Sequence, residues 1–407
     1  MYLCTSETNG FGGVDAAMPN PPNNNMMNKK TVIRPVTTRQ EMKTFAALAN
    51  RLYEGCEYYV PDLEFDVCNM FDAKKNPAFE FCEAQLFLAY KDGNAVGRVA
   101  AMINHRANEK WNVRNVRFGY IDFIDDDEVS LALLNAVEQW GRERGMTHCQ
   151  GPMGFTDFDK EGMLVEGFDK LGSMTTFYNY PYYPQHLERH GYEKEVDWVQ
   201  IRVAVPAETP ERFVRVGELI KRRFNLRVAK LNGRMLFKEG YGQKVFDLLN
   251  QAYAPLFGFS ALSQRQMDEM VKQYFQLINM DLVTTVQDAD GNVVAVGVTM
   301  GSLSHAIRKS KGKLLPLGWW HILRSLRFKM EDTVEMLLIA VKPEFQGKGV
   351  TALLFSDLIP IYNKYKFKWA ETNPQLETNH KELNQWDVLN PTFPKRRRCY
   401  HRVIADK

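Results

Sequence analysis

The sequence predicts a mixed α/β fold of two similar domains, each a twisted mixed sheet flanked by helices. Three observations carry this prediction. A strand-like run, a glycine-rich turn and a helix-like run follow one another over residues 336–362. A hairpin pattern, consisting of a strand, an Asp-Gly turn and a Val-Gly strand, occurs at 85–100 and again at 282–300. The chain has 407 residues and is 45% hydrophobic, which is enough for about two domains with buried cores.

Composition narrows the functional classes. A net charge of +3 is close to neutral and argues against a dedicated nucleic-acid-binding protein. The six cysteines are scattered without Cys-x-x-Cys pairs, so neither a zinc site nor a disulfide framework is expected. No apolar run approaches the roughly 18 residues that span a bilayer, and the N-terminus has no signal pattern. We expect a cytoplasmic protein without a metal or a nucleic-acid partner, and the sequence gives no indication of its oligomeric state.

The N-terminal segment, residues 1–30, is rich in Asn, Gly, Pro and Met. Such a composition cannot bury enough apolar surface to order itself, so we expect this segment to be disordered. Met26 or Met27 could be the true start of the protein, and the sequence does not decide between them and Met1. Organised sequence begins at 31–36.

The first predicted domain covers residues 31–205. A helical pattern over 42–53 precedes the first hairpin, and a strand over 117–123 leads into the acidic segment 124–128. Several carboxylates cap a helix well but repel a bound anion, by about 1 kcal/mol per charge at ~4 Å even in water. We therefore expect no phosphate site there. The helix that follows ends at Gly145 and has its apolar face on Leu133, Leu134, Val137 and Trp140.

The second predicted domain covers residues 206–407 and contains the glycine-rich turn at 341–350. Unpaired N–H groups at a helix N-terminus, together with the helix dipole, favour an anion, and glycine lets the chain approach it closely. Gln346, Gly347 and Gly349 would line such a site. The alternative is an ordinary tight turn between a strand and a helix.

This turn resembles the acyl-CoA loop of the GNAT N-acyltransferase superfamily, whose pattern is Gln/Arg-x-x-Gly-x-Gly/Ala after a strand that commonly ends in Val-x-Pro. Gln346 and Gly349 fit, as do Val341 and Pro343, whereas Thr351 stands where the pattern has Gly or Ala. The layout of residues 31 to 407, including 72–77 before the first hairpin, is similar to bacterial tandem-GNAT proteins. The resemblance implies acyl-CoA or acetyl-CoA as the acyl donor, bound by Leu338, Ile339, Val341, Gln346, Gly347, Lys348, Gly349, Val350 and Thr351.

Acyl transfer to an amine requires a base, because an ammonium group cannot attack a thioester until it loses a proton. The resemblance implies a carboxylate on a strand beside the acyl-CoA, and Glu335 and Glu371 are the two candidates. Members of the superfamily often place a general-acid Tyr about seven residues after an Asn. Counted from Asn379, that position is Trp386, so we expect either Tyr362 to act or the thiolate to leave unaided.

A glycine-hinged segment at 151–163 and an aromatic run at 178–184 predict a pocket loop that meets the amine. The candidate substrate-binding residues are Asp157, Asp159, Glu161 and Tyr182. The alternative is a solvated turn with the aromatic residues packed in the core.

Two further segments are basic. A helix predicted over 317–328 carries paired Trp residues and flanking cations, which suits a membrane interface or a long acyl chain. The alternative is a core helix that packs on the sheet. The run at 395–400 is expected to be an edge or terminal strand with solvated charges, although contact with the CoA 3′-phosphate or an anionic lipid is also open.

We therefore expect an N-acyltransferase that moves an acyl group from acyl-CoA to a primary amine in a ternary complex. The strand before the turn should splay and present a backbone N–H between Met336 and Ile339 to the thioester oxygen. Bacterial GNAT-type ceramide synthases share this general resemblance, so a long-chain acyl donor, a lipid-like amine and peripheral contact with the inner membrane are part of the hypothesis. Two alternatives stay open: a plain N-acetyltransferase of a small amine and a non-catalytic acyl-CoA-binding module.

Overall fold

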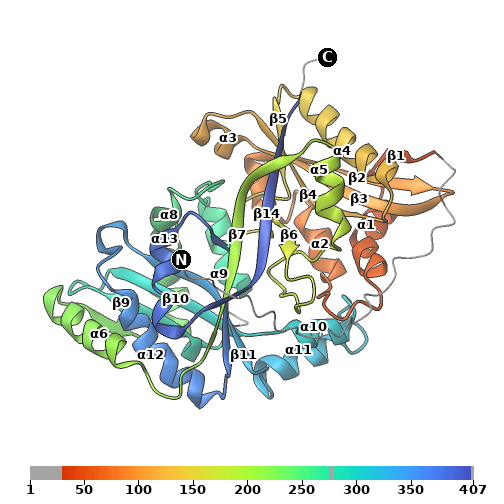
Figure 1. The fold of residues 1–407 in the computed structure, drawn as a ribbon. Helices are drawn as coiled ribbons and strands as arrows, with labels where there is room; N and C mark the ends of the chain where they lie inside the picture. The colour runs from red at the N-terminus through yellow and green to blue at the C-terminus, as the bar shows by residue number, and fades with distance from the viewer. Residues whose placement is uncertain (1–29, 275–277, 405–407) are drawn as a thin grey trace, which may run out of the picture.

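The computed structural model describes residues 30–274 and 278–404. All but the last residue of the segment predicted to be disordered, 1–30, lies outside the described residues. The chain forms a mixed α/β fold in two halves, with helices flanking a twisted mixed sheet, as the sequence predicts (Figure 1). The N-terminal half contains β1 (Val32–Pro35), α1 (Arg39–Leu52), α2 (Glu64–Met70), β2 (Cys82–Lys91), β3 (Asn94–Asn104), α3 (His105–Trp111), β4 (Asn115–Phe123), α4 (Asp127–Arg142), β5 (His148–Gly151), β6 (Met163–Glu166), α5 (Tyr182–Arg189) and β7 (Glu193–Ala204).

The C-terminal half repeats the alternation of helices and strands. It contains α6 (Glu211–Arg223), β8 (Arg227–Ala229), α7 (Gly233–Lys238), α8 (Tyr241–Tyr253), α9 (Gln264–Tyr274), β9 (Val283–Gln287), β10 (Val293–Gly301), α10 (Ser304–Ser310), α11 (Gly318–Arg327), β11 (Thr333–Val341), α12 (Thr351–Lys364), β12 (Trp369–Thr372), β13 (Gln375–Leu376), α13 (His380–Asn384) and β14 (Thr392–Val403).

Both predicted hairpins are present. β2 and β3 are antiparallel and are joined by Asp92 and Gly93, which have φ angles of 53° and 76°. Asp and Gly tolerate this left-handed backbone, and the turn it makes matches the twist of the strands. β9 and β10 pair in the same antiparallel way, and Asp288 holds their turn by accepting hydrogen bonds from the N–H groups of Asp290 and Asn292. The internal repeat of the hairpin is therefore confirmed.

The acidic segment after β4 is engaged by neighbouring groups. Asp126 is the N-cap of α4 and accepts hydrogen bonds from the N–H groups of Glu128 and Val129. Its other carboxylate oxygen lies 2.5 Å from the Nζ of the buried Lys91. A carboxylate thus occupies the N-terminus of α4, whereas glycines precede α12, the matching helix of the second half. This difference supports the expectation that no phosphate binds at the start of α4.

Two long strands cross between the halves and join their sheets. β14, the last strand of the chain, pairs with β5 and β6 of the N-terminal half and with β7. β7 in turn pairs with β12 and β13 of the C-terminal half. Figure 1 shows β7 and β14 side by side through the middle of the molecule. One continuous sheet therefore runs in the order β1-β2-β3-β4-β5-β14-β7-β12-β11-β10-β9-β8.

The basic run in β14 is not a solvated charge run at an edge, and that prediction is wrong. β14 is an interior strand between β5 and β7, where Lys395 and Arg397 are only 3% and 1% exposed. The Nζ of Lys395 lies 2.5 Å from the carboxylate of Glu371, and Arg397 donates a hydrogen bond to the C=O of Phe177. Burial lowers the pKa of Arg397 to about 9.

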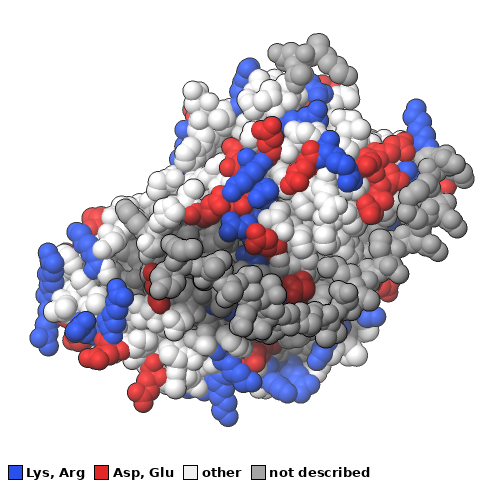
Figure 2. Space-filling view, viewed as in Figure 1, with Lys and Arg blue, Asp and Glu red and all other residues white. Residues whose placement is uncertain are grey.

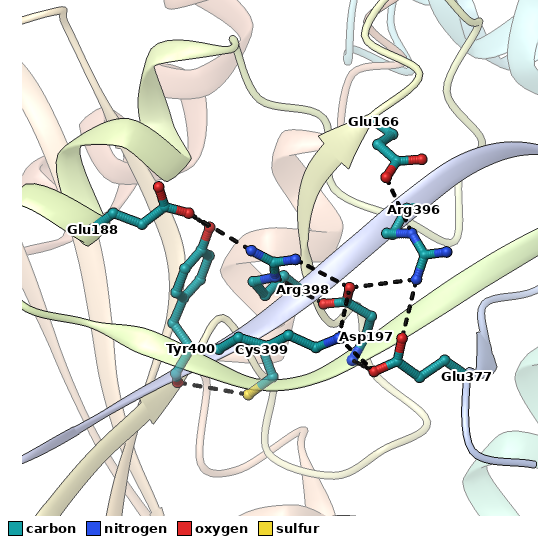
Figure 3. Close-up of polar contacts among 9 residues, drawn as sticks. Glu166, Glu188, Asp197, Glu377, Arg396, Arg398, Cys399 and Tyr400 are labelled. Carbon is teal, nitrogen blue, oxygen red and sulfur yellow. Dashed lines mark hydrogen bonds and ion pairs between the residues drawn. The ribbon is translucent and has the colours of Figure 1, made fainter.

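The other two arginines of the run belong to an ionic network around β7 and β14 (Figure 3). The Nε of Arg398 donates to Asp197 at 2.9 Å, and Arg396 lies 3.1 Å from Glu377 and 3.4 Å from Asp197. Burial alone would raise the pKa of Asp197, but hydrogen bonds from Arg398 and Lys194 bring it below its usual value. Acids from distant segments thus pair with three of the four cations of the run, Lys395, Arg396 and Arg398.

Candidate active site

A cavity of about 960 Å³ lies between the two halves. This volume is at the upper end of the range of about 300–1,000 Å³ that is typical of small-molecule sites. The N-terminal half contributes α2 and the loop at 157–161 to the wall. The C-terminal half contributes α8, β10, α10, α11, β11 and the turn before α12. The glycine-rich turn and the acidic loop therefore face the same space.

The turn before α12 has the geometry of an anion site. Gly347 and Gly349 have φ angles of +73° and +83°, which glycine adopts without strain. α12 begins at Thr351 without a side-chain cap, so no side chain competes for the N–H groups of its first turn. A Cβ at Gly347 would meet no atom within 4 Å, whereas one at Gly349 would lie 2.9 Å from Val216 on α6. The turn is thus open at Gly347 and packed against α6 at Gly349.

Eight of the nine residues that the resemblance implies for the acyl donor line this cavity, and Lys348 does not. The Nζ of Lys348 instead lies over the rings of Phe224 and Phe345, 5.3 and 5.7 Å from their centroids. Gln346 donates its side-chain amide to the C=O of Val341 at 3.0 Å, which fixes the entry into the turn. The structure brings these residues together, while their role in binding stays a prediction.

β11 and β12 separate beside the cavity. They pair in parallel as far as Met336 and Thr372 and then part. The register of β11 against β10 slips between Met336 and Leu338, which places Leu337 in a bulge. In the gap, the side-chain amide of Asn373 donates to the C=O of Leu337 at 2.8 Å. The predicted splay is confirmed, and the edge of β11 beyond Met336 faces the cavity.

Tyr253 connects the acidic loop to this open edge. Its hydroxyl donates to the C=O of Ile339 at 3.0 Å, and its ring stacks on Phe158 of the N-terminal half with 6.1 Å between centroids. Because the N–H and C=O of a strand residue point to the same side, the N–H of Ile339 also points away from β10. Burial raises the pKa of Tyr253, and the charges of Glu382 and Asp157 raise it further. Both carboxyl groups line the same cavity as Tyr253.

Three predicted acids, Asp157, Asp159 and Glu161, line the cavity together. Burial raises the pKa of Asp157 to about 7 and that of Glu161 well above its ordinary value, while the charge of Arg117 acts in the opposite direction. Arg117 donates its hydrogen bonds to three backbone carbonyls and not to these acids. Within the described chain, the buried Oδ1 of Asp157 and Oε2 of Glu161 have no hydrogen-bond partner. The loop can therefore accept hydrogen bonds from a ligand.

Glu382 on α13 also lines the cavity, and the sequence analysis did not single it out. Burial raises its pKa to about 7, although the side chains of Trp386 and Gln385 act in the opposite direction. The sequence does hold a signal, because Asn379-His-Lys-Glu382 is an Asn-x-x-Glu pattern typical of a helix start. In the structure Asn379 makes no side-chain cap, and Glu382 belongs to the cavity wall instead.

Neither predicted base lines the cavity. Glu335 and Glu371 are register partners on β11 and β12, one residue before the cavity-lining Met336 and Thr372. Glu371 is held by Lys395, and Glu335 is buried with its Oε2 free of hydrogen bonds from the described residues. Burial raises the pKa of Glu335 to about 7. The structure places both carboxylates beside the site, so their catalytic role stays a prediction and Glu382 is the better placed group.

The two predicted tyrosines lie elsewhere. Tyr362 on α12 is buried in a core cluster, with its ring centroid 6.1 Å from that of Phe367. Tyr182 packs among the aromatic residues of the N-terminal half and donates its hydroxyl to the C=O of Phe123 at 2.6 Å. The aromatic residues of the run at 178–184 therefore pack in the core, as the alternative to a pocket loop predicted. Neither tyrosine lines the cavity.

Much of the remaining cavity wall is apolar. The side chains come from α8, β10, α10 and α11 and from the chain just before α10. Such a lining favours hydrocarbon over water, because burying apolar area contributes about 25 cal/mol per Å². Representative members are Phe246, Val298, Met300, Leu303, Ile307 and Ile322.

One group of potential metal ligands occurs in the described part of the chain, outside the cavity wall. Donor atoms of Asp127, His186 and His190 lie within 4.8 Å of one another. The Oγ of Ser130 makes a hydrogen bond of 2.8 Å to each of the two histidines. Hydrogen bonds account for this cluster, and the absence of a metal stays a prediction.

Comparisons with known proteins extend over nearly the whole chain, although no family model matches it. The chain is 29% identical over 383 residues to the bacterial ceramide synthase of Caulobacter vibrioides, covering 91% of this chain and 97% of that protein. It is 26% identical over 388 residues to protein YghO of Escherichia coli, covering 93% and 97%. Among solved structures, it is similar to a tandem GNAT protein from the clavulanic acid biosynthesis pathway, with a TM-score of 0.55 and 11% identity over 93% of this chain and 100% of that one.

The structural similarity establishes the fold over both halves, because the match includes the whole of a tandem GNAT protein. The chain is therefore similar over both halves to a tandem GNAT protein in its fold, and over nearly its whole length to a bacterial ceramide synthase in its sequence.

Proposed function

We propose that the protein transfers a long acyl group from acyl-CoA to a lipid-like primary amine. The observation that carries this proposal is the cavity, in which a glycine turn suited to an anion, a large apolar wall and a buried acidic loop meet. A relative that matches nearly the full chain is named a bacterial ceramide synthase. A ceramide is the amide of a fatty acid and a long-chain amino alcohol, so this relative supports both the long acyl chain and the lipid-like amine.

In this proposal, the turn before α12 holds the pyrophosphate of CoA. The N–H groups at the start of α12 and the positive end of its dipole stabilise negative charge. The left-handed glycines let the backbone approach the phosphates without a Cβ in the way. The thioester would then lie along the open edge of β11, with its acyl chain on the apolar wall.

Changing Gly347 to Asp should weaken acyl-CoA binding at least tenfold, or about 1.4 kcal/mol, because a carboxylate would stand beside the pyrophosphate. Gly347→Asn is the matched control, since Asn has the same shape without the charge and tolerates the left-handed backbone. Calorimetry should show the same loss with acetyl-CoA and with decanoyl-CoA, and decanoyl-CoA should bind more tightly to the parent. Equal affinities of the Asp and Asn variants would remove this turn from the donor site.

The chemical step is a direct attack of the neutral amine on the thioester carbonyl carbon. The C–N bond forms, the C–S bond breaks, and the sulfur leaves as the thiolate of CoA, which takes up the second proton that the nitrogen loses to become an amide. The N–H of Ile339 on the open edge of β11 is the group that we assign to the developing oxyanion, because Tyr253 already holds the C=O of the same residue. A fixed donor of this kind stabilises the transition state more than the ground state.

The amine must lose a proton before it attacks, and we assign this proton to Glu382. A base works best when its pKa is near the working pH, and burial brings Glu382 to about 7. The acidic loop with Asp157 and Glu161 would bind the ammonium group before deprotonation, since the oxygens of these side chains that have no partner among the described residues can accept hydrogen bonds from N–H donors. Glu382 and Asp157 line the same cavity, as base and amine site must.

A non-catalytic acyl-CoA-binding module would need the turn and the apolar wall but not the carboxyl groups. Carboxyl groups with pKa values near 7 in a cavity are typical of catalytic sites, although ion-pair networks also produce them. Glu382 and Asp157 therefore favour an enzyme. A plain N-acetyltransferase is the nearer competitor, and the apolar wall argues against it because an acetyl group would leave most of that wall uncovered.

A further inference from the structure

The segment 304–329, which contains α10, its connection and α11, carries an unusual charge. It contains seven Lys and Arg residues and no Asp or Glu, in a chain whose net charge is only +3. The rest of the sequence is therefore net acidic. Figure 2 shows Lys and Arg side chains along the lower edge of the molecule, where α11 lies in Figure 1. The cations are Arg308, Lys309, Lys311, Lys313, Arg324, Arg327 and Lys329.

These cations have no acidic partner among residues 30–274 and 278–404. Within the described residues, none of the seven side chains forms an ion pair or a hydrogen bond. The nearest acids in the sequence have other partners, because Glu331 accepts hydrogen bonds from the N–H groups of His305 and Ala306, and Asp332 pairs with Lys368. The contrast with Lys395, Arg396 and Arg398 of β14, which are paired with acids, is direct.

The same segment exposes large apolar side chains. Five of the sixteen that are exposed in the described chain fall between residues 315 and 328. Trp319 and Trp320 are 46% and 44% exposed, and Leu315 and Phe328 are 76% and 74% exposed. The ring centroids of the two Trp residues are 5.9 Å apart, and those of Trp320 and Phe328 are 6.4 Å apart. The predicted Trp-bearing amphipathic helix therefore has its Trp pair on the surface and not in the core.

The inner side of the segment forms part of the cavity wall. Ile307 and Ile322 line the cavity, while Trp319 and Trp320 of the same segment lie on the outer surface. No helix in the described ranges is long and apolar enough to cross a membrane. The segment therefore contributes both to the cavity wall and to the exposed aromatic surface.

We propose that residues 308–329, here called the α10–α11 surface, dock onto an anionic lipid bilayer and place the cavity at the membrane. Trp rings favour the boundary between headgroups and acyl chains, and each cation near an anionic surface adds to the attraction. A segment that carries only cations suits a uniformly anionic partner such as a lipid surface. The surface of a protein partner would present both signs of charge. The part of this proposal that delivers a lipid amine to the cavity rests on the proposed function.

Flotation with vesicles tests the docking. The full chain should float with vesicles of phosphatidylglycerol and phosphatidylcholine at low salt, and it should be lost at high salt and from pure phosphatidylcholine vesicles. Arg324→Glu with Arg327→Glu should weaken flotation at least tenfold. The matched control is Arg212→Glu with Arg215→Glu on α6, where both residues are exposed, because the charge change is identical and the location differs.

The Trp pair gives a second, independent measurement. Trp319→Ala with Trp320→Ala should weaken flotation while leaving the melting temperature close to that of the parent, because the rings lie on the surface. No flotation of the parent at low salt, or an equal loss in the α6 control, would overturn the docking surface.

The delivery route has its own readout. Arg324→Glu with Arg327→Glu should lose turnover of a long-chain amine held in anionic vesicles and keep turnover of the same amine in detergent micelles. An equal loss in both settings would reject delivery from the membrane. No turnover by the parent in micelles would instead reject the proposed function, so the two failures are distinguishable.

Discussion

Replacing Glu382 with Gln should lower the rate of acyl transfer about 10²- to 10⁴-fold while acyl-CoA binding persists. Gln has the shape of Glu but cannot accept a proton, so the amine would stay as an ammonium ion for longer. The effect should appear in kcat more than in KM, since Glu382 is assigned to proton transfer and not to binding. Single-turnover kinetics with a saturating amine measure it.

The pH dependence separates this role from a structural one. Burial raises the pKa of Glu382 to about 7, and a base must be deprotonated to act, so the rate of the parent should rise with pH through about 7 and fall below it. The Glu382→Gln variant should lose that inflection. A variant that is merely slower, with the same inflection near pH 7, would assign the titration to another group such as Asp157.

Glu335→Gln is the comparison variant, because Glu335 has the same raised pKa of about 7 but does not line the cavity. A large rate loss in Glu335→Gln with little effect in Glu382→Gln would return the base to the strand candidate predicted from the sequence. Asp157→Asn should instead raise KM for the amine more than it lowers kcat, as expected of a group that binds the ammonium.

Lys395→Met should destabilise the protein by about 3–5 kcal/mol at pH 8. The substitution keeps the length of the side chain but leaves the carboxylate of Glu371 in β12 without the cation that lies 2.5 Å away. Chemical denaturation monitored by Trp fluorescence measures the free energy of unfolding. Because β14 joins both halves, the loss should appear in one transition that involves the whole chain.

The double variant Lys395→Met with Glu371→Gln removes the uncompensated charge and should recover most of the loss. A single variant as stable as the double one at pH 8 would show that the pair is not needed.

Local patterns were enough to predict the elements around the acyl-donor turn. Gly347 and Gly349 follow an apolar run and precede a helical pattern, and their left-handed backbone is a local property of glycine. The two hairpins rest on Asx-Gly turn chemistry and alternation, which are equally local. The splay of β11 from β12 could be predicted only through the resemblance, since no residue pattern in β11 itself encodes a bulge.

Features that depend on distant segments could not be predicted in this way. The run at 395–398 looks like a surface strand until Glu371, Asp197 and Glu377 are brought beside it by the crossing of β7 and β14. Tyr182 looks like part of a pocket loop, yet the N-terminal core takes its ring. Glu382 could be noticed only as a helix-start residue, because the burial that raises its pKa comes from tertiary packing.

Detection of the amide product by mass spectrometry tests the central claim most directly. The purified chain is mixed with palmitoyl-CoA or acetyl-CoA and with a long-chain amino alcohol or a short primary amine, and free CoA thiol is measured alongside the amide. The account predicts that the long-chain pair gives amide with one CoA thiol released per amide, and that acetyl-CoA with the short amine gives far less. Amide formed only from acetyl-CoA and the short amine would make the protein a plain acetyltransferase, and binding of both donors without thiol release in any pair would contradict catalysis altogether.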